Sequence, residues 1–326
     1  MRFWVKRVVG EVDKMDCSII ICTRGRVERL KKTLRAFESV RVPRGWDVEL
    51  IVADNDESGS AAKVVWSATL DRMVVRYVHQ PQPGKSRALN AAVAKASGRA
   101  LLFTDDDVEP AESWLERMAE PLVEERCAAV AGRIELAPYL VRSWFGVMHR
   151  TWLAEVLNPA DGKIALVGAS MGIHRSVFEL IGGFDEALGP GASGFGEETL
   201  LGMQIQEAGL LISPVVDTFV VHHPDLARLL RPEWVVAAAR FGETSAYILY
   251  HWEHVVVVFP RIRAWMVWAK LGFRQWLMAG FRIENEGCSE WEMSYRVQIA
   301  RLKRIGFESK SSRNYQFRSL QKNRVK

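Results

Sequence analysis

The stretch ALLFTDDD, residues 100–107, decides the fold assignment. It is an apolar run of strand length that ends in three consecutive aspartates, Asp105, Asp106 and Asp107. Like charges this close together repel each other unless a cation joins them. Mg²⁺ and Mn²⁺ bind carboxylate and phosphate oxygens, so the stretch predicts a metal-diphosphate site at the carboxyl edge of a sheet. The alternative is a solvated acidic turn that caps a helix beginning near Ala111.

Apolar runs of strand length alternate with helix-period stretches on the amino-terminal side of the aspartates. The expected strands cover residues 18–22, 48–53, 74–78 and 100–104, and the expected helices cover 27–38, 61–70 and 86–96. This alternation predicts a parallel sheet, in which ligands collect at the carboxyl ends of the strands. Those ends carry Thr23 and Arg24, Asp54 and Asn55, His79, and the three aspartates. Four polar clusters are therefore expected along one edge.

Length, composition and cysteine content set broad limits. The chain has 326 residues, of which 48% are hydrophobic, so it can bury a full core in one large domain or two. Its four cysteines are far apart and form no CxxC pair, which predicts reduced thiols in a cytosolic protein. The apolar run near the amino terminus is too short for the core of a signal peptide. The expected location is the cytoplasm. A peripheral position on the inner face of the cell membrane is a further possibility.

Charge divides the chain into two segments. Residues 226–326 carry 18 Lys/Arg and 8 Asp/Glu, a balance of +10. The totals of 44 and 39 then leave 26 basic and 31 acidic side chains for residues 1–225, a balance of −5. Two segments with different roles are expected.

Six segments occur in the order typical of one family of enzymes. They are SIIICTRGR (18–26), IVADND (51–56), PGKSRALNAA (83–92), FTDDD (103–107), GASMGIHRSVFELIGGFDE (168–186) and GFGEETLLGMQIQEAG (194–209). Over roughly residues 16–225 the chain resembles the inverting glycosyltransferases of family 2, which have the GT-A fold. The resemblance implies an α/β fold, a mostly parallel central sheet flanked by helices. It also implies a catalytic domain over 1–225, with a nucleotide-sugar half (16–107) and an acceptor half (108–225), and a basic, Trp-rich helical extension over 226–326.

The same resemblance implies transfer of a sugar from a nucleotide-diphosphate donor, with a UDP-sugar preferred, to a hydroxyl of a saccharide or lipid-linked acceptor. The expected setting is the synthesis of cell-envelope or surface polysaccharide or glycolipid. A nucleotidyltransferase, or a catalytically silent protein that binds a nucleotide sugar or glycan, is the alternative. A nicotinamide dehydrogenase is disfavoured because the first strand turn lacks GxGxxG. No recognition motif for nucleic acid is present.

Four residues are expected to contact the nucleotide. Thr23 and Arg24 suit a nucleobase and a phosphate, and Asp54 suits a base N–H, as the equivalent acid does in the family. Lys85 opens a helix whose free backbone N–H groups favour an anion, so it is expected to contact the diphosphate. Each of these residues also has a structural alternative: helix capping for Thr23 and Arg24, an Asx turn for Asp54 and a solvated charge for Lys85.

The resemblance also assigns roles within the aspartate cluster. In addition to the four residues above, Asp105, near the ribose, and Asp106 are expected to contact the nucleotide. Asp107 and Asp105 are expected on the metal, with Mg²⁺ or Mn²⁺ as the cofactor. Relatives commonly place a metal-site histidine after a strand such as 219–221. Adjacent strand side chains point to opposite faces, so one of His222 and His223 at most enters the site, and His222 is preferred on resemblance.

An inverting transfer needs a general base, because the acceptor hydroxyl loses its proton as it attacks. Glu197 and Glu198 are the candidates, in GFGEET where relatives usually carry GED. Glu198 matches the family's catalytic Asp. The alternative is that the two acids complement the dipole of a helix. The glycine-rich segment 189–196, after Asp185, is expected to be a mobile loop that closes over the sugar.

Helical patterns at 232–250 and 261–281 dominate the extension. They place Trp265, Trp268 and Trp276 among arginines, which suits an anionic membrane surface. The alternative is an aromatic stripe that packs on the catalytic domain with the arginines solvated. No transmembrane helix is expected because charged residues interrupt the apolar stretch. The basic tail 310–326 is expected to be disordered and attracted to anionic lipid.

Overall fold

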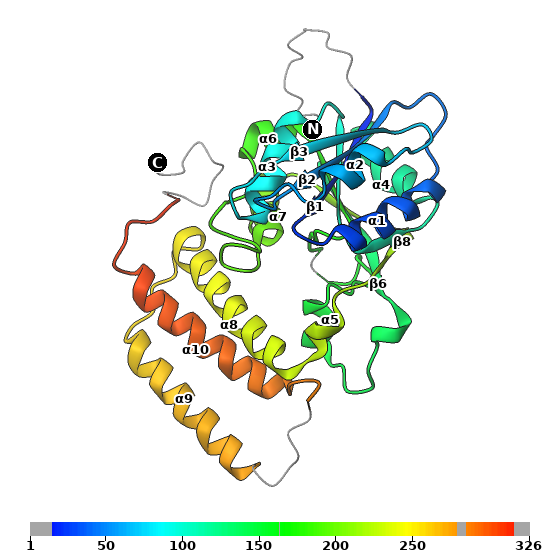
Figure 1. Ribbon diagram of the computed structural model, residues 1–326. Helices are drawn as coiled ribbons and strands as arrows, with labels where there is room; N and C mark the ends of the chain where they lie inside the picture. The colour runs from blue at the N-terminus through cyan, green and yellow to red at the C-terminus, as the bar shows by residue number, and fades with distance from the viewer. Residues whose placement is uncertain (1–14, 163, 279–284, 316–326) are drawn as a thin grey trace.

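The computed structural model describes residues 15–162, 164–278 and 285–315. Within these residues, eight strands form one sheet in the order β3-β2-β1-β4-β7-β6-β8-β5 (Figure 1). The strands are β1 (Cys17–Thr23), β2 (Val48–Asp54), β3 (Val74–His79), β4 (Ala100–Asp105), β5 (Val108–Pro110), β6 (Ala129–Leu136), β7 (Met171–His174) and β8 (Ile212–His222). The first four strands of this order are parallel, β6 and β8 are parallel, and β7 and β5 run antiparallel to their neighbours. The expected mostly parallel sheet is confirmed.

Helices cover both faces of the sheet, because alternate strand residues point to opposite sides. Ile19 and Ile21 belong to a cluster with α1 and α4, whereas Ile20 belongs to a second cluster with α3, α6 and α7. The helices of the catalytic part are α1 (Val27–Ala36), α2 (Ala62–Ser67), α3 (Lys85–Lys95), α4 (Trp114–Val123), α5 (Val147–Trp152), α6 (Arg175–Ile181) and α7 (Glu197–Glu207). The sheet is thus the middle of three layers, and its apolar strands are buried on both faces.

The expected elements differ from the observed ones mainly at their ends. The helix expected at 61–70 ends at Ser67, because Leu70 and Met73 form a β-bridge around Arg72, whose φ is +60°. The helix expected near Ala111 begins at Trp114, since Ala111 still donates its N–H to the Phe219 carbonyl of β8. A tight turn therefore ends the first helix early, and pairing with β8 delays the start of the second.

Three helices form the carboxy-terminal region: α8 (Arg231–Tyr247), α9 (Pro260–Leu277) and α10 (Glu290–Glu308). α10 lies between the other two, so α9 is the outermost element (Figure 1). The first two match the expected helices at 232–250 and 261–281, although the last turn of the former is a π-helix over Ile248–Trp252. The end of the latter, from residue 279, falls outside the described residues, as does most of the tail 310–326. α10 was not expected. No helix among the described residues combines the length and the apolar composition that a membrane span requires.

The helical extension shares a hydrophobic core with the catalytic part. Trp234 and Ala238 of α8 and Met293 of α10 belong to one buried cluster with Leu136 of β6 and Trp152 of α5. A second tie is Asp185, whose Oδ2 accepts hydrogen bonds from the hydroxyls of Tyr247 (2.8 Å) and Tyr315 (2.7 Å). The division of the chain at residue 225 stays a prediction. The shared core and the hydrogen bonds of Asp185 hold α8 next to the carboxyl ends of the strands.

A buried carboxylate joins β2 to its neighbours. Glu49 is fully buried, and it accepts hydrogen bonds from the Ser18 hydroxyl (2.6 Å), the Ser97 amide (2.6 Å) and Arg76 Nη1 (2.5 Å). Burial alone would raise the pKa of Glu49, but these hydrogen bonds outweigh it and lower the pKa.

We expect Glu49→Ala to lower the free energy of unfolding by about 2–3 kcal/mol, because the buried serine and amide donors lose their acceptor. The lowered pKa means that this stability is present above the ordinary value of 4.5 and is lost as the pH falls through the folded-state pKa. Urea unfolding at neutral and acidic pH measures both effects. Glu57→Ala, on the exposed turn after β2, is the control. Equal stability of the two variants at neutral pH would contradict the expectation.

Candidate active site

The carboxyl ends of the strands and the extension enclose a cavity of about 830 Å³. Strand register brings the ends level, since Cys22 of β1 pairs with Asp105 of β4 and Thr23 pairs with Asp54 of β2. The predicted residues that line the cavity are Thr23, Arg24, Lys85, Asp105, Asp107, Glu197, Glu198 and His222. They come from the ends of β1, β4 and β8 and from the first turns of α3 and α7. The structure thus brings together most of the candidates, which are spread over two hundred residues of sequence.

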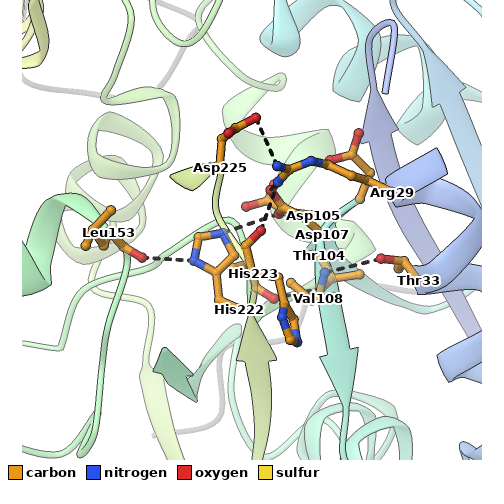
Figure 2. Close-up of polar contacts among 12 residues, drawn as sticks. Arg29, Thr33, Thr104, Asp105, Asp107, Val108, Leu153, His222, His223 and Asp225 are labelled. Carbon is orange, nitrogen blue, oxygen red and sulfur yellow. Dashed lines mark hydrogen bonds and ion pairs between the residues drawn. The ribbon is translucent and has the colours of Figure 1, made fainter. Parts of the chain in front are cut away.

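Asp105, Asp107 and His222 form a group that could hold a metal ion. Each offers one ligand atom, and these atoms lie within 4.8 Å of one another. His222 Nε2 lies 3.3 Å from Asp107 Oδ1, and His222 Nδ1 donates to the Leu153 carbonyl (2.9 Å; Figure 2). With Nδ1 as the donor, the Nε2 of a neutral ring carries a lone pair. The backbone therefore orients this histidine as it would a metal ligand.

The group fits a divalent cation on its own chemistry. Asp107 Oδ1 is buried and has no hydrogen-bond partner. A lone pair on Nε2 facing this carboxylate oxygen is repulsive unless a proton or a cation lies between them. The two carboxylates suit Mn²⁺ and Mg²⁺, and the imidazole favours Mn²⁺, because Mg²⁺ prefers oxygen ligands. His223 points away from this group, to Tyr139 and Glu109, so the structure separates the two histidines as alternation requires.

Two arginines that sequence reasoning missed neutralise the aspartates. Arg26 pairs with Asp106 and Asp107, and Arg29 Nη1 lies 3.4 Å from Asp107 Oδ2. Burial alone would raise the pKa of Asp107, but in the absence of a cation a proton on His222 Nε2, which donates to the carboxylate, and the two arginines lower it to about 2. Both arginines lie at the start of α1, directly after β1. Their position at a strand end was the available signal.

Asp106 is turned away from the cavity. It is fully buried, and its Oδ2 accepts from the Thr23 hydroxyl (2.6 Å) and Arg26 Nε (3.1 Å). Burial raises the pKa of Asp106 to about 6, against the opposing effect of Arg26. This aspartate ties the end of β4 to the end of β1. Its expected contact with the nucleotide stays a prediction.

Asp54 shapes the turn after β2. It is buried, and it accepts from the amides of Asp56 (3.0 Å) and Ala61 (2.8 Å) and from the Tyr77 hydroxyl (3.1 Å). Its neighbour Asn55 lines the cavity instead. The expected contact of Asp54 with a base also stays a prediction.

Lys85 connects the aspartates to the glutamate pair. Its Nζ donates to Asp105 Oδ1 (2.7 Å) and lies 3.8 Å from Glu197 Oε1. Burial would lower the pKa of Lys85, but Asp105, Glu197 and Glu198 raise it well above its usual range. The lysine is therefore charged, and it lies between the two acidic groups.

Glu197 and Glu198 occupy different surroundings. Glu197 is buried beside Lys85. Burial and the neighbouring charge of Glu197 raise the pKa of Glu198 well above its usual range, and Glu198 Oε2 is buried without a hydrogen-bond partner. A carboxyl group with a raised pKa and a free oxygen in a cavity is suited to accept a proton.

The glycine-rich segment 189–196 is packed against α8. The Thr244 hydroxyl lies 3.0 Å from Ser193 Oγ and donates to the Phe195 carbonyl (3.2 Å). Gly196 has a φ of +90°, and a Cβ there would lie 2.5 Å from Thr244 Cγ2, so only glycine fits. The expected mobility of this loop stays a prediction. Its contacts make α8 part of the cavity.

Aromatic side chains from the catalytic part and from α8 of the extension form one wall of the cavity. Trp152, Phe195, Trp234 and Phe241 line it, with the rings of Trp152 and Phe241 5.4 Å apart. Arg228, whose pKa is lowered by burial, lies near the aspartates and also lines the cavity. Sequence reasoning placed only Phe195 near the site, as part of the segment 189–196 expected to close over the sugar.

The fold and the strand-end acidic group define a glycosyltransferase of the GT-A class. Residues 18–182, half of the chain, match the family model described as glycosyl transferase family 2. The chain belongs to that family, and the expected resemblance is confirmed. Glu197, Glu198 and His222 lie beyond the matched residues.

Curated relatives and one solved structure agree with this assignment. The "Succinoglycan biosynthesis protein ExoM" of Rhizobium meliloti (strain 1021) is 33% identical over 145 residues, which cover 43% of this chain and 46% of the relative. The "Pre-mycofactocin glycosyltransferase" of Mycobacterium tuberculosis (strain ATCC 25618 / H37Rv) is 25% identical over 240 residues, which cover 71% of this chain and 47% of the relative. Each match spans about half the length of the relative.

The mannosyltransferase PcManGT from Pyrobaculum calidifontis, solved in complex with GDP-Man and Mn²⁺, has a TM-score of 0.54 and 16% identity. The similarity covers 90% of this chain and 87% of that one. At this identity the likeness shows the fold alone, and the expected GT-A fold with a helical carboxy-terminal region is confirmed.

Proposed function

We propose that the chain is an inverting glycosyltransferase that moves a sugar from a nucleoside diphosphate donor to a hydroxyl acceptor with the aid of a divalent metal ion. The observation that carries the proposal is a single cavity that contains both Asp105, Asp107 and His222 and the pair Glu197 and Glu198. The first group suits a cation bound to a diphosphate, and the second suits a general base.

The donor binds on the strand side of the cavity. Thr23, Arg24 and Asn55 line that side next to Lys85, whose charge attracts the diphosphate. Mg²⁺ or Mn²⁺ held by Asp105, Asp107 and His222 would neutralise the negative charge that develops on the departing nucleoside diphosphate. A UDP-sugar is the preferred donor, and a GDP-sugar is the second choice because the solved PcManGT structure contains GDP-Man.

The acceptor binds on the opposite side, against α8 and α7. Its hydroxyl oxygen forms a bond to the anomeric carbon as the bond from that carbon to the diphosphate oxygen breaks. The hydroxyl proton passes to Glu198, whose Oε2 is free to accept it. Attack from the face opposite to the leaving group inverts the configuration at the anomeric carbon.

The aromatic wall favours a saccharide acceptor, because the apolar faces of sugar rings pack on aromatic side chains. We expect Phe241→Ala to raise the acceptor KM roughly three- to tenfold, from a loss of about 0.5–1.5 kcal/mol, without changing the affinity for the nucleotide. Steady-state kinetics with the acceptor varied measures this effect. Phe307→Ala, an exposed phenylalanine on α10, is the control. An unchanged acceptor KM would show that the aromatic wall does not contact the acceptor.

The biological setting is part of the proposal. The name of the ExoM relative refers to succinoglycan biosynthesis, which supports a role in cell-envelope or surface polysaccharide or glycolipid synthesis, with a saccharide or lipid-linked acceptor. All four cysteines are free and buried, which is consistent with a reducing cytoplasm. We place the chain in the cytoplasm, at the inner face of the cell membrane.

Incubation with UDP- and GDP-sugars, Mn²⁺ and a set of glycan acceptors tests the proposal. The expected result is a glycoside of inverted anomeric configuration by NMR, with release of a nucleoside diphosphate. Pyrophosphate release from a nucleoside triphosphate would indicate a nucleotidyltransferase. Binding of nucleotide sugars without hydrolysis or transfer would indicate a silent binding protein.

A further inference from the structure

α9 buries only a narrow stripe of its surface. Ala264 and Leu271 are its buried residues, and α10 covers them. Large apolar side chains elsewhere on the helix are exposed to solvent, including Trp265 at 65% and Trp276 at 71% of their surface. Exposed aromatic residues in this number mark an interaction surface.

The exposed residues of α9 are sorted by chemistry around the helix axis. At about 100° per residue, the side opposite Ala264 and Leu271 is an apolar arc of about 120°. The members of this apolar arc are Ile262, Trp265, Met266, Phe273, Trp276 and Leu277, all of them exposed. Arg263, Lys270 and Arg274 flank the arc on one side and Arg261 on the other, and all four are exposed. α9 contains no acidic residue.

We propose that α9 lies flat on the surface of an anionic lipid bilayer, with the apolar arc inserted among the lipid headgroups and acyl chains. An amphipathic helix with tryptophans on one face and basic residues beside them binds membranes in this way. The basic flank is complementary to phosphatidylglycerol and other anionic lipids, and each basic residue near such a surface adds to the attraction. α9 is the outermost helix, so a flat surface can reach it without obstruction by α8 or α10 (Figure 1).

Charge complementarity favours a bilayer over a second copy of the chain. A symmetric contact between two copies of α9 would place four positive charges of one copy against four of the other, with no acid on either helix to pair with them. An anionic lipid surface provides the opposite charge across the whole face of the helix.

A short exposed segment joins the lining of the cavity to α9 along the chain. Glu253 lines the cavity, and the exposed apolar residues Val256, Val258 and Phe259 follow it and lead directly into α9. A bilayer at α9 would therefore present a lipid-linked acceptor close to Glu253. This consequence rests on the proposed function, whereas membrane binding by α9 does not.

Vesicle flotation of the full chain tests the proposal. We expect the protein to float with vesicles of phosphatidylcholine and phosphatidylglycerol, and to float less with phosphatidylcholine alone or at high salt. Trp265→Ser with Trp276→Ser, and separately Arg263→Glu with Lys270→Glu, should each reduce the vesicle-bound fraction at limiting lipid at least about tenfold. All four side chains are exposed, so thermal melting should be unchanged.

Matched controls separate this surface from general stickiness. Trp66→Ser removes a tryptophan of 73% exposure on α2, and Lys31→Glu with Lys63→Glu reverses two exposed charges of the catalytic part. These variants should float like the wild type. Absence of flotation, or equal losses in the control variants, would overturn the proposal. The proposal would also be overturned if the wild type bound no lipid but formed a concentration-dependent dimer that the α9 substitutions abolish. Sugar transfer to a water-soluble acceptor is measured in parallel, because no residue of α9 lines the cavity. Transfer without flotation would contradict membrane binding alone, and flotation without transfer would contradict the proposed function alone.

Discussion

Asp107→Asn is expected to reduce sugar transfer on the order of 10³-fold. Asparagine has nearly the same shape but removes the charge of the carboxylate whose Oδ1 faces His222 at 3.3 Å. The cation would lose a charged ligand, and Arg26 and Arg29 would lose a partner, leaving positive charge where the metal should bind. Initial rates with the donor identified in the transfer assay, measured over a range of Mn²⁺ concentrations, give the size of the effect.

Glu109→Gln is the control for Asp107→Asn, because Glu109 is exposed, lies two residues along the chain, and pairs with the outer histidine, His223, instead of His222. It should retain wild-type activity and the same dependence on Mn²⁺. If Asp107→Asn kept its activity at low Mn²⁺ concentration, Asp107 would not be a metal ligand.

Glu198→Gln is expected to reduce kcat by about 10²–10⁴, the usual contribution of a general base. Affinity for the nucleotide should stay the same, because the glutamine replaces a group on the acceptor side. In the wild type, burial and the charge of Glu197 raise the pKa of Glu198, and a base acts only when deprotonated. The rate should therefore rise with pH, along an acid limb whose midpoint lies above the ordinary 4.5 of a glutamate. The pH dependence of kcat/KM measures it.

Glu197→Gln tests the assignment of the base to Glu198. Glu197 lies beside Lys85, so its loss should position the lysine less well and raise the donor KM. The acid limb of the pH profile should also shift to lower pH, because the charge of Glu197 no longer raises the pKa of Glu198. Glu207→Gln, at the other end of α7, should change neither quantity. A larger kcat loss in Glu197→Gln than in Glu198→Gln would exchange the two roles.

Local sequence was sufficient for the elements that carry most of the site. β1, β2 and β4 are apolar runs of strand length, and polar residues follow each of them directly, so parallel pairing alone brings Thr23, Asn55 and Asp105 to one edge. Glycine, lysine and serine at 84–86 identified the start of α3 in the same way. These features depend on periodicity and on neighbours in sequence, which a single chain displays.

The missing parts depend on long-range contacts. Sequence reasoning assigned no role to Arg26 and Arg29, and the fold shows that they face Asp106 and Asp107, about eighty residues away. The aromatic wall likewise required α5 and α8 to meet across a shared core. α10 is the exception, because the apolar residues Ile299, Leu302 and Ile305, three apart, were a local helix signal.

The central claim is that Asp105, Asp107 and His222 hold a divalent cation on which a nucleoside diphosphate binds. Calorimetric titration of the wild type with UDP and with GDP, in Mn²⁺ and in EDTA, tests it most directly. We predict that one nucleotide binds at least about tenfold more tightly in Mn²⁺, and that Asp107→Asn abolishes the difference. Equal affinity in Mn²⁺ and EDTA, or no binding of either nucleotide, would contradict the claim.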